Sequence, residues 1–591
     1  MVDSHDALFP SIAAEARRAV PTRPEAALFR LKATLLRIRR RWRDATVDVP
    51  LQRHPVGTSL IDAPVIAQSR SPLWSAGSDP QEWALTAGKV QNLRVALRGL
   101  DGIEIPAGAV FSFWRQIGRA TRRRGFVAGR ELREGCMIST VGGGLCQLSN
   151  ALYDTALGAG FEIVERHAHS RVVPGSRAVQ GRDATVFWNY VDLRFRSRHA
   201  FRIEARMTDV DLDIRFRGIG GADETQTPPS SAPQSTVHDC VSCGQVSCFR
   251  HVPRPGLSPA HRAAWLIDAC WPEYAAVFQE QAGPADTLFL PMRGPLARRY
   301  AWPASPGREV RATRVALARA IASRRQSAQG RAIQTLALTY DRRLAETYAR
   351  HLPYIATHLV VSQSLLPHLW QLGCLQGRTF DVLMERWPLA ELQARLDDAL
   401  RAHPGSPTLG DFRAPPDIVD AEASALAAAD RLYTPHAGLA GLLGEQAVLL
   451  PWVQPRSVTR RVPGGRTLLF PASPLGRKGV YALREALQGL DVDLLVAGRA
   501  REDTSRFWGD IAVRTLDGPA WPDRLAGVVL PAIIEHQPRA LLRAQAVGIP
   551  VIASTACGLM QQPGTTLVDH DDVAALRAAI VACLESSALD T

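Results

Sequence analysis

The chain has 591 residues, of which 46% are hydrophobic, enough for roughly three or four domains with buried cores of ordinary size. Its formal net charge of +13 comes mostly from arginine and suits phosphates or an anionic membrane; a uniformly arginine-rich composition would give the same charge, and no specific nucleic-acid partner is expected. No segment approaches the roughly 18–20 consecutive apolar residues of a membrane span, and Met1–Asp6 lacks the basic start of a signal peptide. We therefore expect a cytoplasmic protein.

Residues 1–54 are expected to be an N-terminal extension that contains one helix. Apolar residues recur at helical spacing over residues 28–42, and basic residues lie between them. The apolar positions are Leu28, Leu31, Leu35, Ile38 and Trp42, and the basic ones include Lys32, Arg37, Arg39, Arg40, Arg41 and Arg43. Two interpretations are open. The helix lies on the anionic inner face of the cell membrane, or it packs on the next domain and its polar side is solvated.

A mixed α+β domain is expected over residues 55–220. Its last part alternates apolar and polar residues over 192–196, 201–206 and 212–216, which is the pattern of half-buried strands. Residues 218–236 are rich in Gly, Pro, Ser, Thr and Gln. A linker is therefore expected over 221–260.

A cysteine and two histidines in this domain are candidate catalytic residues. Gly142–Gly144 precede Cys146 and allow a tight turn that would place the thiol at a helix N-terminus, where a thiolate is favoured. After a helical stretch come His167 and His169, either of which could pair with the thiol. Asp183 or Asp192 could orient that histidine. Cysteine and histidine are also common in protein cores, so a structural role is the alternative.

Several ordered motifs in the same domain resemble the VanW family. They span about residues 60–215 and comprise Leu100-Asp101-Gly102, Pro106-Ala107-Gly108, Phe111-Ser112-Phe113, Ile117-Gly118, Gly142–Asn150 and Glu165–Ser170. Many members of the family are exported or membrane-anchored and associated with cell-wall material. The resemblance implies a VanW-like domain that binds or modifies an envelope glycan or its precursor, and it implies no agreed catalytic residues.

A second cysteine cluster lies in the predicted linker. The chain has nine cysteines and no export signal, which favours thiols or metal ligands over disulfide bonds. Three thiolates and one imidazole at short spacing are typical of a closed structural Zn²⁺ site, and an iron–sulfur cluster or free thiols are the alternatives. The predicted ligands are Cys240, Cys243, Cys248 and His251.

The second half of the chain alternates helical segments with short apolar strands. One series of strands is predicted at 287–290, 358–362, 380–384, 431–434 and 448–452, and another at 467–470, 494–497, 527–530, 550–554 and 566–568. Continuous apolar strands that alternate with helices indicate buried parallel sheets. We therefore predict two Rossmann-like α/β domains, over residues 261–455 and 456–591, on either side of a cleft.

The last domain contains residues suited to a nucleotide-sugar. Gly476-Arg477-Lys478-Gly479 lies between a strand and a helix, and cations there could meet a diphosphate. Glu535 follows a later strand, and Gly548 precedes the turn and strand Ile549–Ala553.

This order of motifs resembles the nucleotide-binding half of GT-B glycosyltransferases of the family 4 type over about residues 460–586, and as fold back to about 283. The resemblance implies that Lys478 and Arg477 contact the donor diphosphate and Glu535 the ribose. Arg543 and Ser473 stand where the family usually has a Glu and an Arg, and Thr555–Gln562 lacks the family's acidic turn.

Three functions are compatible with these patterns. The first is a glycosyltransferase that transfers a sugar from a nucleotide donor to a glycan or lipid-linked acceptor in cell-envelope or surface-glycan biosynthesis. The second is a thiol enzyme in which Cys146 acts with His167 or His169 on a cell-wall amide. The third is a non-catalytic scaffold that binds glycan or nucleotide and contains a degenerate transferase domain.

Overall fold

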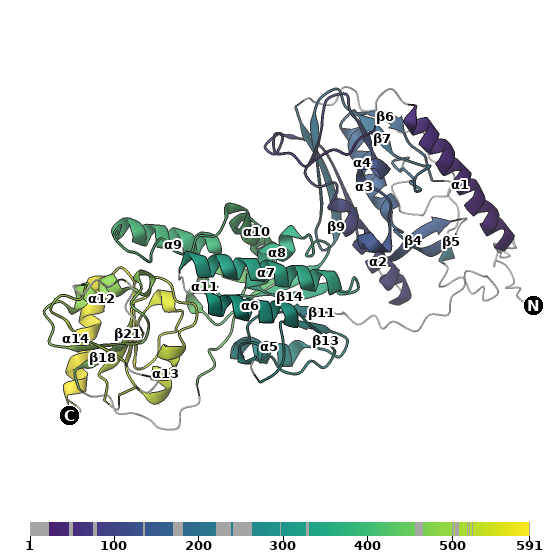
Figure 1. Ribbon diagram of the computed structural model, residues 1–591. Coiled ribbons are helices and arrows are strands. Elements are labelled where there is room, and N and C mark those ends of the chain that lie inside the picture. Colours follow the sequence, from purple (N-terminus) through teal and green to yellow (C-terminus); the bar gives the residue numbers. More distant parts are fainter. Residues whose placement is uncertain are drawn as a thin grey trace, which may run out of the picture. The chain divides into compact units, whose positions relative to one another are not determined.

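The computed structural model describes two separate units, Met1–Pro259 and Ala260–Thr591, which are treated individually (Figure 1). The described residues are 23–46, 51–74, 80–133, 136–169, 181–219, 238–239, 263–295, 297–326, 330–455, 465–498, 502, 507–516, 518, 521–522 and 524–589. Within these ranges, no helix is long and apolar enough to span a membrane.

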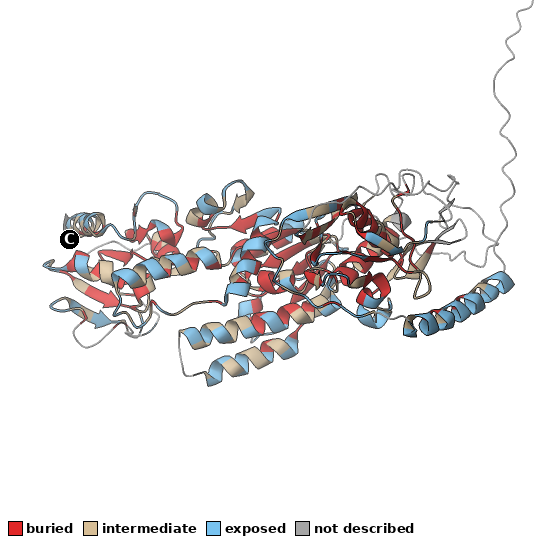
Figure 2. Ribbon diagram, turned by 90° about the horizontal axis from the view of Figure 1, so that it is seen from above, coloured by how far each residue is buried: buried red, intermediate tan, exposed pale blue. Residues whose placement is uncertain are grey.

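The predicted N-terminal helix is present as α1 (Arg23–Ala45) and contacts its domain through polar side chains. Arg40 donates to Glu165 and to Asp44, and Arg37 donates to the carbonyl of Trp188 at 2.9 Å. The apolar side of the helix faces outward instead, and most of α1 is exposed in Figure 2. The helix α1 therefore packs on its domain through polar residues and not through its apolar ones.

The mixed α+β part of unit 1 is built on a four-stranded antiparallel sheet with the order β1-β9-β8-β2. Its strands are Val65–Pro72, Asp211–Gly218, Phe201–Met207 and Ile103–Ile105. Two three-stranded sheets complete the fold, β3-β7-β6 and β10-β5-β4. Their strands are Val110–Ser112, Arg194–Arg196, Glu162–Glu165, His238–Asp239, Cys136–Val141 and Ala128–Arg133. The three predicted strands at 192–196, 201–206 and 212–216 are thus confirmed within a few residues.

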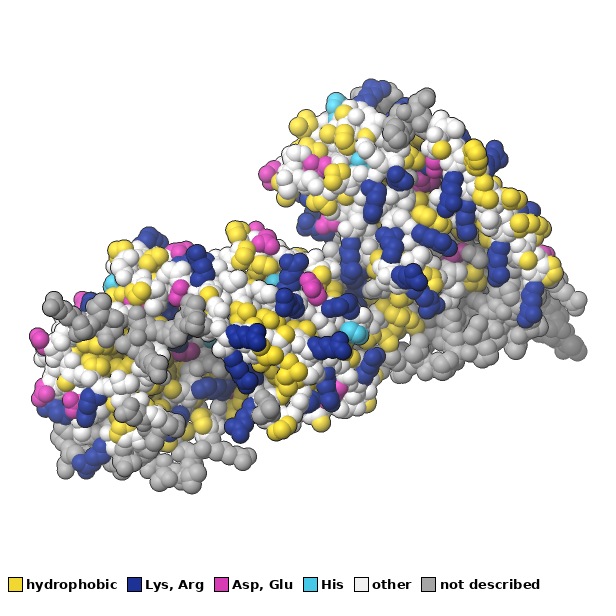
Figure 3. All heavy atoms as spheres, viewed as in Figure 1, with side chains coloured by type: hydrophobic (Ala, Val, Ile, Leu, Met, Phe, Trp, Pro, Cys, Tyr) yellow, Lys and Arg dark blue, Asp and Glu magenta, His cyan; other side chains and the backbone are white. Residues whose placement is uncertain are grey.

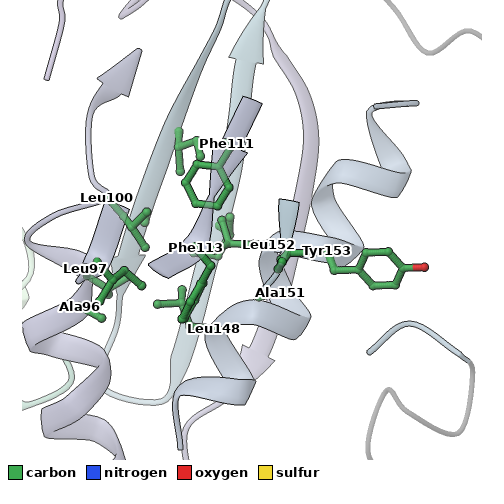
Figure 4. Packing of buried hydrophobic residues seen from close by; sticks show 14 of the residues in the cluster. Ala96, Leu97, Leu100, Phe111, Phe113, Leu148, Ala151, Leu152 and Tyr153 are labelled. Atoms are coloured by element: carbon green, nitrogen blue, oxygen red, sulfur yellow. The ribbon is translucent and has the colours of Figure 1, made fainter. Parts of the chain in front are cut away.

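The core of this unit lies between the sheets and the helices α2 (Pro80–Leu97) and α4 (Leu145–Gly158). Strand β9 alternates buried and partly buried residues, so that Leu212, Ile214 and Phe216 enter the core. Figure 4 shows Leu148 and Leu152 of α4 packed with Phe111 and Phe113. The apolar side chains of the strands and those of α4 therefore pack in one layer, and this packing fixes the position of α4.

Unit 2 begins with a seven-stranded parallel sheet of the order β13-β12-β11-β14-β15-β16-β17. Its strands in chain order are Ala263–Leu266, Thr287–Leu290, Arg308–Arg311, His358–Ser362, Thr379–Leu383, Arg431–Thr434 and Ala447–Leu449. The helices around it are Pro272–Gln281, Thr313–Arg325, Arg331–His351, Leu366–Gln371, Leu389–Ala402, Pro416–Ala427 and Ala437–Leu443. The strand order reverses between β11 and β14, which is the Rossmann arrangement.

A second parallel sheet follows with the order β20-β19-β18-β21-β22-β23. Its strands in chain order are Thr467–Phe470, Asp493–Val496, Ala512–Thr515, Gly527–Leu530, Val551–Ser554 and Thr565–Val568, and its helices are Val480–Leu487, Arg539–Val547 and Val573–Leu589. The central strands β21 and β22 are buried along their whole length, as parallel strands covered on both faces must be (Figure 2). The predicted pair of Rossmann-like domains is confirmed.

Candidate functional sites

The glycine turn of unit 1 places Cys146 in the first turn of a helix. Strand β5 ends at Val141, and α4 begins at Leu145. Gly144 adopts a φ of 94°, and a Cβ atom on it would lie 2.2 Å from Cγ of Lys89, so only glycine fits without displacing a neighbour. Cys146 is partly buried and belongs to the free cysteines of the described chain. The first turn of a helix presents the positive end of its dipole to a side chain at this position.

His169 connects this cysteine to Asp183. Its Nδ1 atom lies 2.6 Å from Oδ2 of Asp183, and its main-chain N–H donates to the same oxygen at 2.7 Å. Burial lowers the pKa of His169, but hydrogen bonds to Asp183 and Cys146 and the negative charge of both groups raise it to about 9. The three side chains therefore form a Cys–His–Asp series in which the histidine is protonated at neutral pH.

Asp183 is fixed by groups on both sides. Arg166 donates from Nη2 to Oδ1 at 2.7 Å and from Nε to the carbonyl of Asp183 at 2.7 Å. The next residue, Ala184, is held to α4 because its N–H donates to Asn150 at 2.8 Å and its carbonyl accepts from Ser149 at 2.5 Å. Burial raises the pKa of Asp183, but the bonds from His169 and Arg166 bring it below its ordinary value.

The other predicted residues of this module lie apart from the thiol. His167 is half-exposed, and its Nε2 atom is 3.2 Å from Glu165. Asp192 is buried, accepts hydrogen bonds from Ser112 Oγ at 2.6 Å and from the N–H of Trp114 at 3.1 Å, and has a pKa raised by burial. Of the alternatives that the sequence left open, the structure thus brings His169 and Asp183 to the cysteine, and it gives His167 and Asp192 other contacts.

In unit 2, Lys478 and Glu535 form a buried ion pair. Lys478 follows β18 and Glu535 follows β21, the two neighbouring strands at which the order of the second sheet reverses. The two side chains are only 11% and 13% exposed. Burial lowers the pKa of Lys478, against the attraction of the Glu535 carboxylate. Ligands of doubly wound sheets bind at this reversal, beyond the carboxyl ends of the strands.

The glycine after Lys478 allows this turn to approach the neighbouring loop. Gly479 has a φ of 79°, and a Cβ atom on it would lie 1.8 Å from the carbonyl oxygen of Pro531. The carbonyl of Arg477 accepts from the N–H groups of Ile533 and Ile534 at 3.0 and 3.1 Å. The turn that contains Lys478 and Gly479 is therefore hydrogen-bonded to the loop that carries Glu535.

Arg477 itself is partly buried. Its guanidinium lies 5.2 Å from the ring of Phe412, and its Nε atom has no hydrogen-bond partner among the described residues. Burial lowers the pKa of this arginine, and the charges of Glu535 and Asp411 oppose that effect. An incompletely satisfied buried cation is a suitable partner for an anionic ligand.

Two histidines that the sequence did not single out adjoin Glu535. His536 is partly exposed, and desolvation together with the charges of Arg477 and Lys478 lowers its pKa well below the usual value, so it is neutral. His436, from the other domain of unit 2, lies with Nε2 3.1 Å from the carbonyl oxygen of Glu535. Each follows an apolar strand, His436 after β16 of the first sheet and His536 after β21 of the second, which is the only sequence signal that could have indicated them.

A third residue that the sequence did not single out, Glu502, holds the start of the glycine turn. It accepts hydrogen bonds from the N–H of Gly476 at 2.8 Å and from the hydroxyl of Tyr481 at 2.7 Å. Ser406, in the preceding domain of unit 2, donates to it at 2.9 Å. Glu502 therefore connects the turn to the preceding domain.

The remaining predicted donor residues have other surroundings. Gly548 ends α13 in a left-handed conformation and precedes β22, so it lies at the amino edge of the sheet, away from Lys478. Gly548 ends the helix Arg539–Val547, and its contact with a donor stays a prediction. Arg543 lies with its guanidinium 4.4 Å from the ring of Trp521.

No cluster of three or more His, Cys, Asp and Glu residues suited to a metal ion occurs in the described part of the chain. The predicted zinc ligands Cys240, Cys243, Cys248 and His251 all lie outside the described residues. The zinc site therefore stays a prediction.

Solved structures that align with unit 2 are distant in sequence. A sucrose-phosphate synthase from Thermosynechococcus elongatus is 16% identical, with 56% of this chain and 90% of that chain covered and a TM-score of 0.35. Alr3699/HepE from Anabaena, solved in complex with UDP and glucose, is 14% identical, with 55% and 90% covered and a TM-score of 0.32.

Sequence comparison gives closer relatives for unit 1. "Uncharacterized protein YoaR" of Bacillus subtilis (strain 168) is 34% identical over 108 residues, 18% of this chain and 35% of that protein. "Vancomycin B-type resistance protein VanW" of Enterococcus faecalis (strain ATCC 700802 / V583) is 35% identical over 114 residues, 18% of this chain and 41% of that protein. The chain thus spans well under half the length of these relatives. Residues 88–217 match the family described as "VanW like protein", and the chain therefore contains a VanW-like domain.

Proposed function

We propose that unit 2 is a glycosyltransferase that transfers a sugar from a nucleotide-sugar donor bound beside Lys478 and Glu535. The observation that carries this proposal is the buried ion pair of these two residues at the strand-order reversal of the second sheet. Two Rossmann-like domains in one unit supply a donor side and an acceptor side, as in the GT-B transferases of family 4 that the sequence resembles. UDP and glucose in Alr3699/HepE illustrate the class of ligand.

The proposed donor site uses cations of this chain rather than a metal ion. Lys478 and Arg477 would face the diphosphate, and their charge would stabilise the negative charge that develops on it as the sugar leaves. When Lys478 turns to the diphosphate, Glu535 loses its cation and becomes free to accept hydrogen bonds from the ribose hydroxyls. Because His536 is neutral, it can accept or donate one hydrogen bond there without repelling the nearby cations.

The acceptor is proposed to be a cell-envelope or surface glycan, or its lipid-linked precursor. One support is the VanW-like domain, since a relative is named as a vancomycin resistance protein. The other is α1, whose apolar side chains are exposed next to basic ones (Figure 3). We propose that α1 lies on the anionic inner face of the cell membrane, where lipid-linked acceptors are found.

Calorimetric titration with UDP-glucose, UDP-galactose, ADP-glucose and GDP-mannose tests the donor site. We expect one of these donors to bind the wild type, and Lys478→Ala and Glu535→Gln to weaken binding about tenfold or more. Lys32→Ala and Glu445→Gln are matched controls, because both residues are exposed and neither belongs to the turn. Absence of binding by the folded wild type, or equal losses in the controls, would refute the proposed site.

Turnover separates an enzyme from a scaffold. Arg543 stands where related transferases have a second glutamate, so a domain that binds a donor without using it is the competing function. The released nucleoside diphosphate can be measured with the donor that binds best, in the presence of membrane lipid extract as a source of acceptor. Release that depends on Lys478 supports transfer, whereas tight binding without release supports the scaffold.

A further inference from the structure

The proposed transferase makes no use of the thiol, imidazole and carboxylate that meet in the VanW-like domain. We propose that Cys146, His169 and Asp183 form a second active site, in which Cys146 is the nucleophile that cleaves or transfers an acyl group of an amide or ester. The contacts of His169 with both partners, the turn that places the cysteine, and the fixed position of Asp183 carry this inference.

The surroundings of Cys146 differ from those of Cys270, Cys557 and Cys583. Burial raises the pKa of Cys270 and Cys583 to about 11 and that of Cys557 to about 12, so these thiols are unreactive at neutral pH. Cys146 instead lies in the first turn of α4 and is hydrogen-bonded to a histidine that is cationic at neutral pH. A helix N-terminus and an adjacent imidazolium are the two features that convert a thiol into a nucleophile.

His169 is oriented so that it can serve the thiol. Its Nδ1 atom lies against Asp183, which leaves the Nε2 side of the ring for the cysteine. Asp183 is a positioning residue, because it touches the imidazole and Arg166 rather than the thiol. Since Ser149 and Asn150 of α4 hold the residue after Asp183, one helix fixes all three members of the series.

A partly buried cation lies next to the same turn. The stem of Lys89, on α2, is against Gly144, and the ammonium has no ion-pair or hydrogen-bond partner in the described ranges. Gly144 lies two residues before Cys146, so this positive charge belongs to the turn that carries the thiol and would attract a substrate with a carboxylate. Amides with a neighbouring carboxylate are therefore the substrate class that suits this site best.

The chemistry balances with water as the only co-reactant. The thiolate sulfur of Cys146 attacks the carbonyl carbon, the C–N bond of an amide or the C–O bond of an ester breaks, and His169 gives a proton to the leaving amine or alcohol. A thioester on Cys146 results. Water then attacks the thioester carbon, the C–S bond breaks, and His169 takes up a proton from the water. The products are a carboxylic acid and the regenerated thiolate. An amine in place of water would give acyl transfer.

The full chain can be tested with iodoacetamide and 4-nitrophenyl acetate, and tandem mass spectrometry locates the modified cysteine. At pH 7 we expect Cys146 to be alkylated faster than Cys270, Cys557 and Cys583, and to form an acetyl thioester. His169→Gln should slow both reactions of Cys146 about 100-fold. His167→Gln is the matched control, because this exposed histidine lies two residues away, and it should leave the rates unchanged.

The pH profile separates a positioning role of Asp183 from a merely structural one. In Asp183→Asn, the imidazolium is less stable, so the alkylation rate of Cys146 should rise at higher pH than in the wild type, while the near-UV circular dichroism stays unchanged. The proposal is overturned if His169→Gln and His167→Gln behave alike in folded protein. It is also overturned if Cys146 reacts no faster than the buried cysteines.

Discussion

Arg539 of α13 (Arg539–Val547) and Glu273 of α5 (Pro272–Gln281) form a bidentate ion pair between the two Rossmann-like domains of unit 2. Nη1 and Nη2 of the arginine lie 2.8 and 2.7 Å from Oε1 and Oε2 of the glutamate, and the side chain of Glu273 is completely buried. The guanidinium also lies 5.3 Å from the ring of Trp452, in the segment that joins the domains. The ion pair therefore links the two Rossmann-like domains to each other beside α13.

Removal of either partner of this pair should destabilise unit 2. Arg539→Ala leaves a buried carboxylate without its cation, which should cost about 3–5 kcal/mol in the free energy of unfolding. Glu273→Ala should cost less, because Arg539 is 31% exposed and can be solvated. Urea unfolding of both variants and of the double variant measures the coupling. If Arg539→Ala and Glu273→Ala each lowered the free energy of unfolding by less than about 1 kcal/mol, the pair would not stabilise unit 2 as proposed.

Protonation of His169 should make the stability of unit 1 depend on pH. Its pKa is raised to about 9 in the folded protein, against about 6.5 when unfolded, so its stabilising effect is complete below about pH 6.5 and is lost as the pH rises through about 9. The thermal midpoint of wild type should therefore fall toward that of His169→Gln between pH 6.5 and 9.5. His167→Gln should follow the wild type. A constant difference between wild type and His169→Gln would argue against a charged histidine.

The sequence predicted both parallel sheets because their central strands are short, apolar and separated by helices. It missed three strands. One is β11, Ala263–Leu266, which is as short and apolar as the central strands that were predicted. The other two, β13 and β20, lie at the sheet edges and are polar and partly exposed. Periodicity does not mark such segments, because their place in the sheet is decided by contacts with residues far away in the chain.

For the candidate sites, the sequence predicted several of the residues but not which of them contact one another. Cys146, Lys478 and Glu535 stand beside glycines or strand ends, which are local signals. The choice of His169 over His167 could not be made from sequence, because both follow the same strand and only the fold decides which one faces α4. Asp183 lies far from Cys146 in the chain, and the next residue, Ala184, is held to α4 by a hydrogen bond to Asn150. The outward apolar face of α1 also depends on tertiary ion pairs, such as Arg40 with Glu165.

Lys89 should lower the free energy of unfolding of unit 1 and raise the reactivity of Cys146. Burial and the nearby charge of Arg130 lower its pKa to about 8, from about 10.5. The folded protein thus binds this proton less readily than the unfolded chain, and the penalty is complete below about pH 8. Lys89→Met should therefore raise the free energy of unfolding at pH 7 by on the order of 1 kcal/mol and slow alkylation of Cys146. Lys32→Met, on the exposed side of α1, should change neither quantity. Lower stability or faster alkylation in Lys89→Met would contradict this account.

The exposed face of α1 should bind anionic membranes. Leu31, Leu35 and Trp42 are 58%, 57% and 72% exposed, although the helix is held to its domain by Arg40. Exposed basic residues of the same helix are Arg23, Arg30, Lys32, Arg39, Arg41 and Arg43. An apolar strip flanked by cations matches the surface of an acidic bilayer, in which apolar side chains enter the lipid and cations meet phosphates.

Co-sedimentation with vesicles of phosphatidylglycerol and phosphatidylcholine measures this binding. We expect the chain to sediment with the anionic vesicles at low salt and much less with pure phosphatidylcholine, because the cations contribute about 1 kcal/mol each near an acidic surface. Leu31→Asp with Leu35→Asp should abolish sedimentation. Ile219→Asp is the matched control, since Ile219 is 74% exposed on unit 1 outside α1 and should not matter. Equal vesicle binding by the double variant and the wild type would show that the apolar side of α1 does not enter lipid. The proposal of a lipid-linked acceptor would then no longer be supported by α1.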